Sequence, residues 1–156
     1  MTIKIGDKAP EFALKDKDGQ LWKLKDLPSD HIVIYFYPKD NTTGCTTEAT
    51  EFTQFLPHFK RLKTKVIGIS GGDEKSKQKF CEQHNLKVLL LSDPEFTTCN
   101  KYGVYGEKSF LGKKFMGIKR TTFVLDNKHA IIKIYENVRA EGHSKDVLRF
   151  LESLHT

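Results

Sequence analysis

Residues 32–51 read IVIYFYPKDNTTGCTTEATE, and this stretch contains the two features that decide the fold. Residues 32–37 form an unbroken apolar and aromatic run, which is typical of a strand covered on both faces of a sheet. Residues 41–44 then supply a polar loop and a helix cap. From Cys45 onward, apolar residues recur in steps of three and four, which indicates an amphipathic helix. The stretch therefore predicts a central strand, a short loop and a helix with Cys45 in its first turn.

The sequence on either side of this stretch predicts an α/β domain with a mixed sheet. Residues 12–24 indicate a β-hairpin that turns at Asp18-Gly19. The other predicted strands span 66–70, 88–91, 121–125 and 130–135. The other predicted helices span 73–84, 94–102 and 143–154. Strands and helices alternate through the middle of the chain, as in layered α/β proteins, and the last two strands are expected to form a hairpin.

Two segments interrupt the regular pattern. Pro57 lies inside the helical spacing that follows Cys45, so it is expected to kink or split that helix. Residues 102–116 are rich in glycine and aromatic residues and are predicted to form a long loop. The chain has no repeats, no low-complexity tract and no linker, so residues 1–156 are predicted to form one domain.

Composition excludes several classes of protein. Hydrophobic residues make up 38% and charged residues 29%, which is a globular balance without an apolar stretch long enough to cross a membrane. The net charge is +6, but the lysines are scattered and no basic run is interleaved with aromatic residues, which argues against nucleic-acid binding. The start, MTIKIGDKAP, has no apolar signal region, so we expect a cytoplasmic protein. The three cysteines are then expected to be thiols or redox groups.

Cys45 is the residue that suggests chemistry. Free backbone N–H groups and the positive end of the helix dipole favour an anion in a first helical turn, and a thiolate is such an anion. Because Ala49 and Phe52 follow it on one stripe, the sulfur should point partly into the protein. Thr42 or Thr43 could cap the helix. Considered alone, Cys45 could equally be a small buried hydrophobic residue, which is the usual role of a free cysteine.

Other cysteine chemistries fit the sequence less well. The chain has no C-x-x-C motif, so a dithiol oxidoreductase would lack its second thiol. Cys81 and His84 lie one helical turn apart, but no neighbouring residue completes a metal-binding set. A holdase chaperone or nucleic-acid-associated protein that uses the basic surface is the remaining alternative of another class.

The segment YFYPKDNTTGCTTEA resembles the active site of the bacterioferritin-comigratory, or Q-type, peroxiredoxins. Pro38, Thr42 and Cys45 reproduce the peroxiredoxin pattern P-x-x-x-[TS]-x-x-C. Further similar stretches occur along nearly the whole chain: GDKAPEFAL, VIGIS, LLSD, YGVYGEKSFLGK, GIKRTTFVLD and GHSKDVL. The resemblance implies a thioredoxin-like fold with an N-terminal β-hairpin, a mixed central sheet and helices on both faces. It also implies a thiol peroxidase active in antioxidant defence.

The resemblance assigns roles to five residues. Cys45 resembles the peroxidatic cysteine, which attacks the peroxide and becomes a sulfenic acid. Thr42 would hydrogen-bond the thiolate and the peroxide, and Pro38 would shield the site from water. Arg120 resembles the arginine that stabilises the thiolate and polarises the peroxide, and Glu48 resembles the acid that orients this arginine. Fixed donors near the leaving oxygen would stabilise its developing negative charge.

The sequence departs from the family pattern at two positions near Cys45. Thr43 replaces a usual proline, and Thr50 occupies the position at which many relatives carry a resolving cysteine. Cys81 is the preferred resolving residue, as in a subset of Q-type relatives, and an outside thiol is the alternative. Cys99 is interpreted as a core residue. Because a disulfide requires Cα atoms within about 7 Å, we expect local unwinding before Cys45 and Cys81 can join.

The predicted cycle ends with reduction of the Cys45–Cys81 disulfide by an external dithiol, with thioredoxin as the preferred reductant. The predicted substrates are hydrogen peroxide and organic hydroperoxides. The resemblance implies no metal and no organic cofactor, and it favours a monomer.

Overall fold

The apolar run after residue 31 forms β3 (His31–Phe36), an interior strand of a seven-stranded sheet. In the computed structural model, β3 pairs in parallel with β4 (Thr64–Ser70) and in antiparallel with β8 (Thr121–Leu125). Residues 32–36 of this strand are almost completely inaccessible to solvent. The prediction of a central strand covered on both faces is therefore confirmed.

The sheet has the strand order β2-β1-β5-β4-β3-β8-β9. β1 (Ala13–Lys15) and β2 (Leu21–Lys23) form the predicted N-terminal hairpin. β5 (Leu89–Ser92) pairs in parallel with β4, and β9 (Ile131–Tyr135) pairs in antiparallel with β8. A parallel centre flanked by antiparallel outer strands makes the sheet mixed, as predicted.

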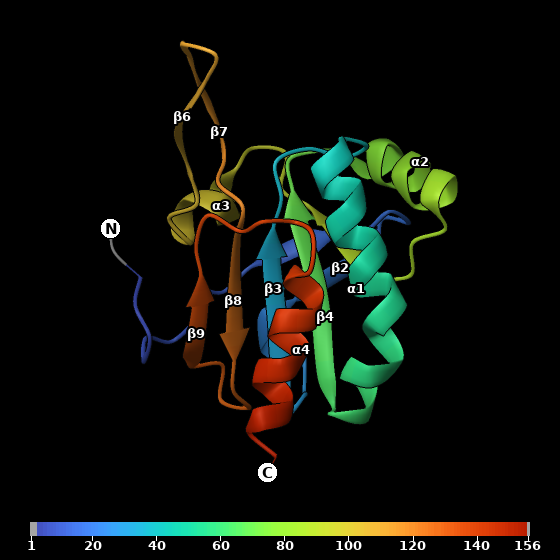
Figure 1. The fold of residues 1–156 in the computed structure, drawn as a ribbon, viewed down its shortest axis with the longest axis vertical. Helices are drawn as coiled ribbons and strands as arrows, with labels where there is room; N and C mark the ends of the chain where they lie inside the picture. The colour runs from blue at the N-terminus through green and yellow to red at the C-terminus, as the bar shows by residue number, and fades with distance from the viewer. Residues whose placement is uncertain (1–2, 156) are drawn as a thin grey trace.

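Helices cover both faces of this sheet (Figure 1). Val33 and Tyr35 of β3 belong to a hydrophobic cluster shared with α1 (Thr43–Arg61), α2 (Glu74–His84) and α4 (His143–Ser153). Alternate residues of β3 point to the opposite face, because side chains alternate along a strand. That face holds a second cluster, which includes residues from a short 3₁₀ turn (Leu24–Asp26) and from α3 (Thr97–Lys101).

Pro57 does not split the helix that follows Cys45. α1 continues from Thr43 to Arg61 with Pro57 inside it, so of the two expected effects of Pro57, a kink or a split, the split is wrong. Proline removes one backbone hydrogen bond from a helix interior. Phe52 and Phe59 are completely buried on either side of Pro57, and their burial is worth more than one backbone bond. Tertiary packing therefore holds the helix together through the proline.

The segment predicted to be a long loop contains a β-hairpin. β6 (Tyr105–Phe110) and β7 (Lys113–Ile118) pair in antiparallel register from Tyr105↔Ile118 to Phe110↔Lys113. Figure 1 shows this hairpin extending away from the central sheet. Most of its residues are exposed, so its sequence lacks the regular alternation of apolar and polar residues that marks a half-buried strand. Its base leads through Ile118 to Arg120, which lies just before β8.

The structure describes residues 3–155, so residues 1, 2 and 156 of the predicted domain lie outside the described residues. None of the helices within this range combines the length and the apolar character that crossing a bilayer requires.

Candidate active site around Cys45

Cys45 is the third residue of α1, in the helix turn that follows β3 and its loop. Its side chain is 1% exposed, and Ala49 and Phe52 on the same stripe of the helix are equally buried. The first turn of a helix has backbone N–H groups without intrahelical partners, and these favour a negative charge. The predicted position of Cys45, in a first turn and facing inward, is confirmed.

Arg120 joins Cys45 to Glu48. Its Nη2 atom lies 3.4 Å from the Cys45 sulfur, and its Nη1 atom donates to Glu48 Oε1 at 2.6 Å. Glu48 is one helical turn after Cys45, so both residues face the loop before β8 that carries Arg120. A Cβ atom on Gly44 would lie 3.1 Å from Arg120 Nη2, so the absence of a side chain there leaves room for the guanidinium. The structure therefore brings together three of the predicted residues.

The Arg120–Glu48 pair is mostly excluded from solvent. Glu48 is completely buried and the side chain of Arg120 is 17% exposed. Burial raises the pKa of Glu48 to about 7, although the adjacent guanidinium opposes that rise. Burial alone would lower the pKa of Arg120, but the Glu48 carboxylate and the Cys45 sulfur raise it overall. Arg120 therefore stays a cation, whereas Glu48 changes its charge near neutral pH.

This shift predicts a pH dependence of stability. In the unfolded chain the carboxyl group of Glu48 has its ordinary pKa of 4.5, whereas in the folded protein its pKa is about 7. At a pH between these two values, the folded protein holds a proton that the unfolded chain has released. The free energy of unfolding should therefore fall as the pH rises through this window and level off above it. The contribution of Glu48 should change by about 3 kcal/mol at most. Urea unfolding of wild type and Glu48→Gln across the window measures this contribution as the difference between the two proteins.

Glu82→Gln is the matched control, because Glu82 is an exposed residue of α2. The difference between wild type and this control should not change across the same window. If the difference in free energy of unfolding between wild type and Glu48→Gln also stays constant across the window, Glu48 is ionised over this whole pH range.

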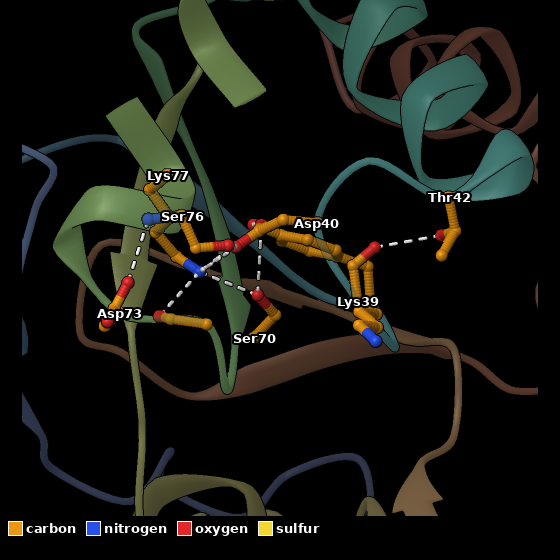
Figure 2. Close-up of polar contacts among 9 residues, drawn as sticks. Lys39, Asp40, Thr42, Ser70, Asp73, Ser76 and Lys77 are labelled. Carbon is orange, nitrogen blue, oxygen red and sulfur yellow. Dashed lines mark hydrogen bonds and ion pairs between the residues drawn. The ribbon is translucent and has the colours of Figure 1, made fainter. Parts of the chain in front are cut away.

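Thr42 and Pro38 lie in the loop between β3 and α1. Thr42 is the N-cap residue of α1, but its side chain accepts no hydrogen bond from the helix, so the expected side-chain cap is wrong. Its hydroxyl instead donates to the carbonyl of Lys39 at 2.9 Å (Figure 2). The proton of Thr42 is therefore not directed at Cys45 in this structure. Pro38 is partly buried and lies two residues after the end of β3.

A buried ionic cluster fastens this loop to α2 (Figure 2). Lys77 is completely buried, and its Nζ atom lies 3.3 Å from Asp40 Oδ2 and 2.7 Å from Ser70 Oγ. Asp40 also accepts hydrogen bonds from the hydroxyls of Tyr37 and Ser76, each at 2.6 Å. Asp40 precedes Cys45 by five residues, and Lys77 precedes Cys81 by one helical turn. The cluster therefore connects the two segments that carry the predicted reactive cysteines.

Sequence reasoning missed this cluster, because a lysine within a polar helix is normally exposed. Burial lowers the pKa of Lys77, and the carboxylate of Asp40 opposes that change. Burial and the same carboxylate raise the pKa of Tyr37 well above its ordinary value. The spacing of Lys77 and Phe80, which puts both on one side of α2, was the available signal.

The other two cysteines lie on opposite faces of the sheet. Cys81 belongs to the same hydrophobic cluster as Cys45, whereas Cys99 is completely buried in the cluster on the other face. All three are free thiols. Burial raises the pKa of the Cys81 thiol, and burial with a nearby Asp93 raises that of Cys99. Cys81 is therefore the thiol that shares a face with Cys45.

Tyr35 carries a buried polar group whose pKa responds to the charges of Cys45 and Cys81. Its hydroxyl is completely buried and has no hydrogen-bond partner among the residues that the structure describes. The ring stacks on Phe52 with centroids 4.5 Å apart, and it occupies the space that a Cβ atom on Gly68 would need. Burial raises the pKa of Tyr35 well above its ordinary value, and the charges that Glu48, Cys45 and Cys81 can carry raise it further. The hydroxyl is therefore a donor held close to the reactive groups without a partner.

Removal of this hydroxyl should stabilise the fold. Tyr35→Phe keeps the stacked ring and eliminates an unpaired buried donor, so the free energy of unfolding should rise by about 1 kcal/mol. Tyr37→Phe is the matched control, because the hydroxyl of Tyr37 donates to Asp40. Its loss should lower the free energy of unfolding by about 1–3 kcal/mol. Urea unfolding of the two variants beside wild type tests both signs, and a destabilised Tyr35→Phe would contradict the account.

No group of three or more His, Cys, Asp or Glu side chains is arranged to hold a metal ion within residues 3–155. The Cys81–His84 pair gains no further ligand, and His84 Nε2 instead lies 3.0 Å from Asn41 Oδ1.

Comparison with known sequences gives matches over nearly the whole chain. Residues 5–134 match the model of the AhpC/TSA family. Peroxiredoxin Bcp of Bacillus subtilis is 41% identical over 154 residues, which cover 99% of this chain and 98% of the relative. Peroxiredoxin Bcp of Escherichia coli is 36% identical over 150 residues, with 96% of each chain covered.

Solved structures show the same fold. A mutant of PrxQ from Xylella fastidiosa superposes with a TM-score of 0.93 at 31% identity, covering 100% of this chain and 99% of that one. The bacterioferritin comigratory protein of Xanthomonas campestris, described for its reduction of alkyl peroxides, superposes with a TM-score of 0.86. It is 32% identical and covers 93% of this chain and 92% of its own. The thioredoxin-like fold predicted from the sequence is confirmed.

Proposed function

The chain belongs to the AhpC/TSA family and is a peroxiredoxin, and on that premise we propose that it reduces hydrogen peroxide and organic hydroperoxides through Cys45 in antioxidant defence. Peroxiredoxins are peroxidases and therefore oxidoreductases. The observation that carries the proposal is the contact of one guanidinium, that of Arg120, with both the Cys45 sulfur and Glu48. The alkyl peroxide reduction described for the Xanthomonas campestris protein supports organic hydroperoxides as substrates.

In the first step, the Cys45 thiolate attacks one oxygen of the peroxide and breaks the O–O bond. Sulfur is oxidised to a sulfenic acid, and the other oxygen leaves with the electron pair and takes up a proton as water or an alcohol. Negative charge grows on the leaving oxygen, and the Arg120 guanidinium lies where it can donate to that oxygen. Glu48 holds this guanidinium in place. In this scheme Pro38 would shield the site from water, and Thr42 would have to turn away from Lys39 to donate to the peroxide.

In the second step, the Cys81 thiol attacks the sulfenic sulfur, a disulfide forms and water leaves. Support comes from the common hydrophobic cluster of Cys45 and Cys81, which lies across the sheet from Cys99. Both sulfurs are buried on different helices, and Cys81 is only 6% exposed. The first turn of α1 and the helix around Cys81 therefore have to open before the disulfide forms.

The cycle closes when an external dithiol of the thioredoxin type reduces the disulfide by thiol–disulfide exchange. The protein itself works as a monomer in the reducing cytoplasm. The reactions need no metal or organic cofactor, because both electrons come from thiols.

Intact mass after one equivalent of hydrogen peroxide tests this scheme. Wild type and Cys99→Ser are expected to lose two hydrogens, which is the mass change of a disulfide. Cys81→Ser is expected to gain oxygen instead, because the sulfenic acid then has no partner within the chain. Cys45→Ser is expected to keep its mass.

Different outcomes would contradict different parts of the proposal. Oxygen gain by wild type without a disulfide would show that Cys81 is not the resolving cysteine and that an outside thiol is required. Oxidation of Cys45→Ser at the wild-type rate would remove Cys45 as the peroxidatic residue. Insulin reduction without peroxide consumption would favour a thiol–disulfide oxidoreductase on the same fold.

A further inference from the structure

A cavity of about 830 Å³ lies beside Cys81. It is bounded by the C-terminal half of α1, by α2, by the start of β4, by β5 and by the residues that follow β1. Its lining includes Cys81 but not Cys45, Glu48 or Arg120. Its volume lies within the range of about 300–1,000 Å³ that is usual for small-molecule sites. The cavity is therefore separate from the peroxide site and large enough for an organic ligand.

The floor of the cavity is aliphatic. Its apolar lining includes Leu56, Pro57, Val66, Leu86, Val88 and Leu90. Val66, Leu86, Val88 and Leu90 also belong to the core cluster on this face, so the floor is part of the folded core. None of the described residues in the lining is aromatic, so a flat ring would find no stacking partner. An extended hydrocarbon chain suits this surface better than a nucleobase.

Four lysines surround this floor: Lys17, Lys60, Lys65 and Lys87. Within residues 3–155 no ion pair includes any of them. Asp16 is the only acidic residue in the lining among residues 3–155. Its carboxylate already accepts hydrogen bonds from the Trp22 indole and from the backbone N–H groups of Asp18 and Gln20. The cavity therefore presents four cations against one carboxylate around an apolar floor, and this excess of positive charge attracts anions.

Lys65 is the lysine whose environment most favours an anionic partner. It extends from β4, is partly buried, and has its Nζ atom 5.0 Å from the centroid of the Trp22 ring. Burial lowers the pKa of Lys65, and no carboxylate opposes that change. A bound anion would supply the missing negative charge.

We propose that this cavity binds an amphiphile with one aliphatic chain and one anionic head group, with a fatty-acid anion as the representative ligand. The chain would lie on the aliphatic floor, and the head group would pair with Lys65 and the neighbouring lysines. Because Cys81 forms part of the wall, an occupied cavity would also cover its thiol. The proposal does not depend on the peroxidase scheme, since binding is measured without peroxide.

Isothermal titration calorimetry of the reduced full chain with laurate, below its critical micelle concentration, tests the proposal. Saturable binding at one site is expected. The Lys17→Met/Lys65→Met double variant should weaken binding by about tenfold or more, and Lys128→Met should leave it unchanged. Lys128 is the matched control because it is exposed and does not line the cavity. Dodecanol, which has the same chain without the charge, should bind at least about tenfold more weakly.

Alkylation of Cys81 by iodoacetamide in the Cys45→Ser/Cys99→Ala chain gives a second readout. Laurate is expected to slow this alkylation in proportion to occupancy, and dodecanol at the same concentration should have little effect. The proposal is overturned if laurate shows no saturable binding, if dodecanol binds as tightly, or if the double variant binds as wild type does. Laurate binding that leaves Cys81 equally reactive would place the ligand elsewhere and would also overturn it.

Discussion

Replacement of Arg120 by methionine is expected to slow the reaction of Cys45 with hydrogen peroxide by about 10²- to 10³-fold. The guanidinium lies 3.4 Å from the Cys45 sulfur and is the one charged donor in hydrogen-bond contact with it among the described residues. A donor fixed before reaction costs no reorganisation when charge develops on the leaving oxygen, and methionine provides none. Rapid quenching with an alkylating agent, followed by intact mass, measures the rate of this single step.

The size of the loss in reaction rate depends on the geometry of the arginine side chain as well as on its charge. Arg120→Lys keeps the charge but has one ammonium group, which cannot reach Cys45 and Glu48 through separate nitrogens. We expect it to recover only part of the lost rate. Lys119→Met removes an exposed neighbouring charge and should react as wild type does.

Arg120→Met also removes the hydrogen-bond partner of the buried Glu48 carboxyl group, which destabilises the fold. The Arg120→Met/Glu48→Gln double variant removes both charges and is expected to fold while staying slow. A wild-type rate in either folded variant would show that Arg120 does not stabilise the transition state.

The residues near Cys45 show what the sequence could predict and what it could not. The position of Cys45 in a first helical turn followed from local patterns, since the apolar run and the helical spacing meet there. The meeting of Arg120 with Cys45 did not follow from such patterns, because 75 residues separate them along the chain. Only the resemblance to a family supplied that contact before the fold was known.

The features that were not predicted from the sequence each have a physical cause in particular residues. The β6–β7 hairpin was missed because its large side chains, Phe110 and Leu111 among them, are exposed, so no buried face gave a period of two. Pro57 was expected to kink or split α1, yet the helix is not split, because tertiary packing of the flanking phenylalanines outweighs the lost backbone bond. Lys77 was not distinguished from the exposed residues of its polar helix. Its burial depends on Asp40, which only the fold brings near.

Replacement of Lys77 by methionine is expected to lower the free energy of unfolding by about 3–5 kcal/mol. The reason is the charge left behind: the carboxylate of Asp40 is 2% exposed and would lose its cation. Asp40→Asn should cost a similar amount, because it leaves the ammonium group of Lys77 buried without its anion. The double variant should lose less than the sum of the two, since no unpaired charge remains. Urea unfolding of the four proteins in this cycle measures the coupling, and strictly additive losses would contradict it.

The same cluster should control how readily Cys81 is released. Lys77 lies one turn before Cys81 on α2, and its contacts with Asp40, Ser70 and the carbonyl of Gly72 hold that turn against the loop before α1. A weaker cluster should raise the population of open α2, since local opening depends on local stability. Hydrogen exchange of the α2 amides should therefore become faster in Lys77→Met, and disulfide formation after peroxide should accelerate.

Two further variants keep this prediction testable. Ser76→Ala removes only the 2.6 Å hydrogen bond to Asp40, so it provides a milder weakening if Lys77→Met does not fold. Lys79→Met removes an exposed lysine from the same helix and should change neither hydrogen exchange nor the rate of disulfide formation. If Ser76→Ala exchanges faster but forms the disulfide at the wild-type rate, opening of α2 does not limit resolution. The limiting motion would then lie in the first turn of α1, where Cys45 itself must leave its contact with Arg120.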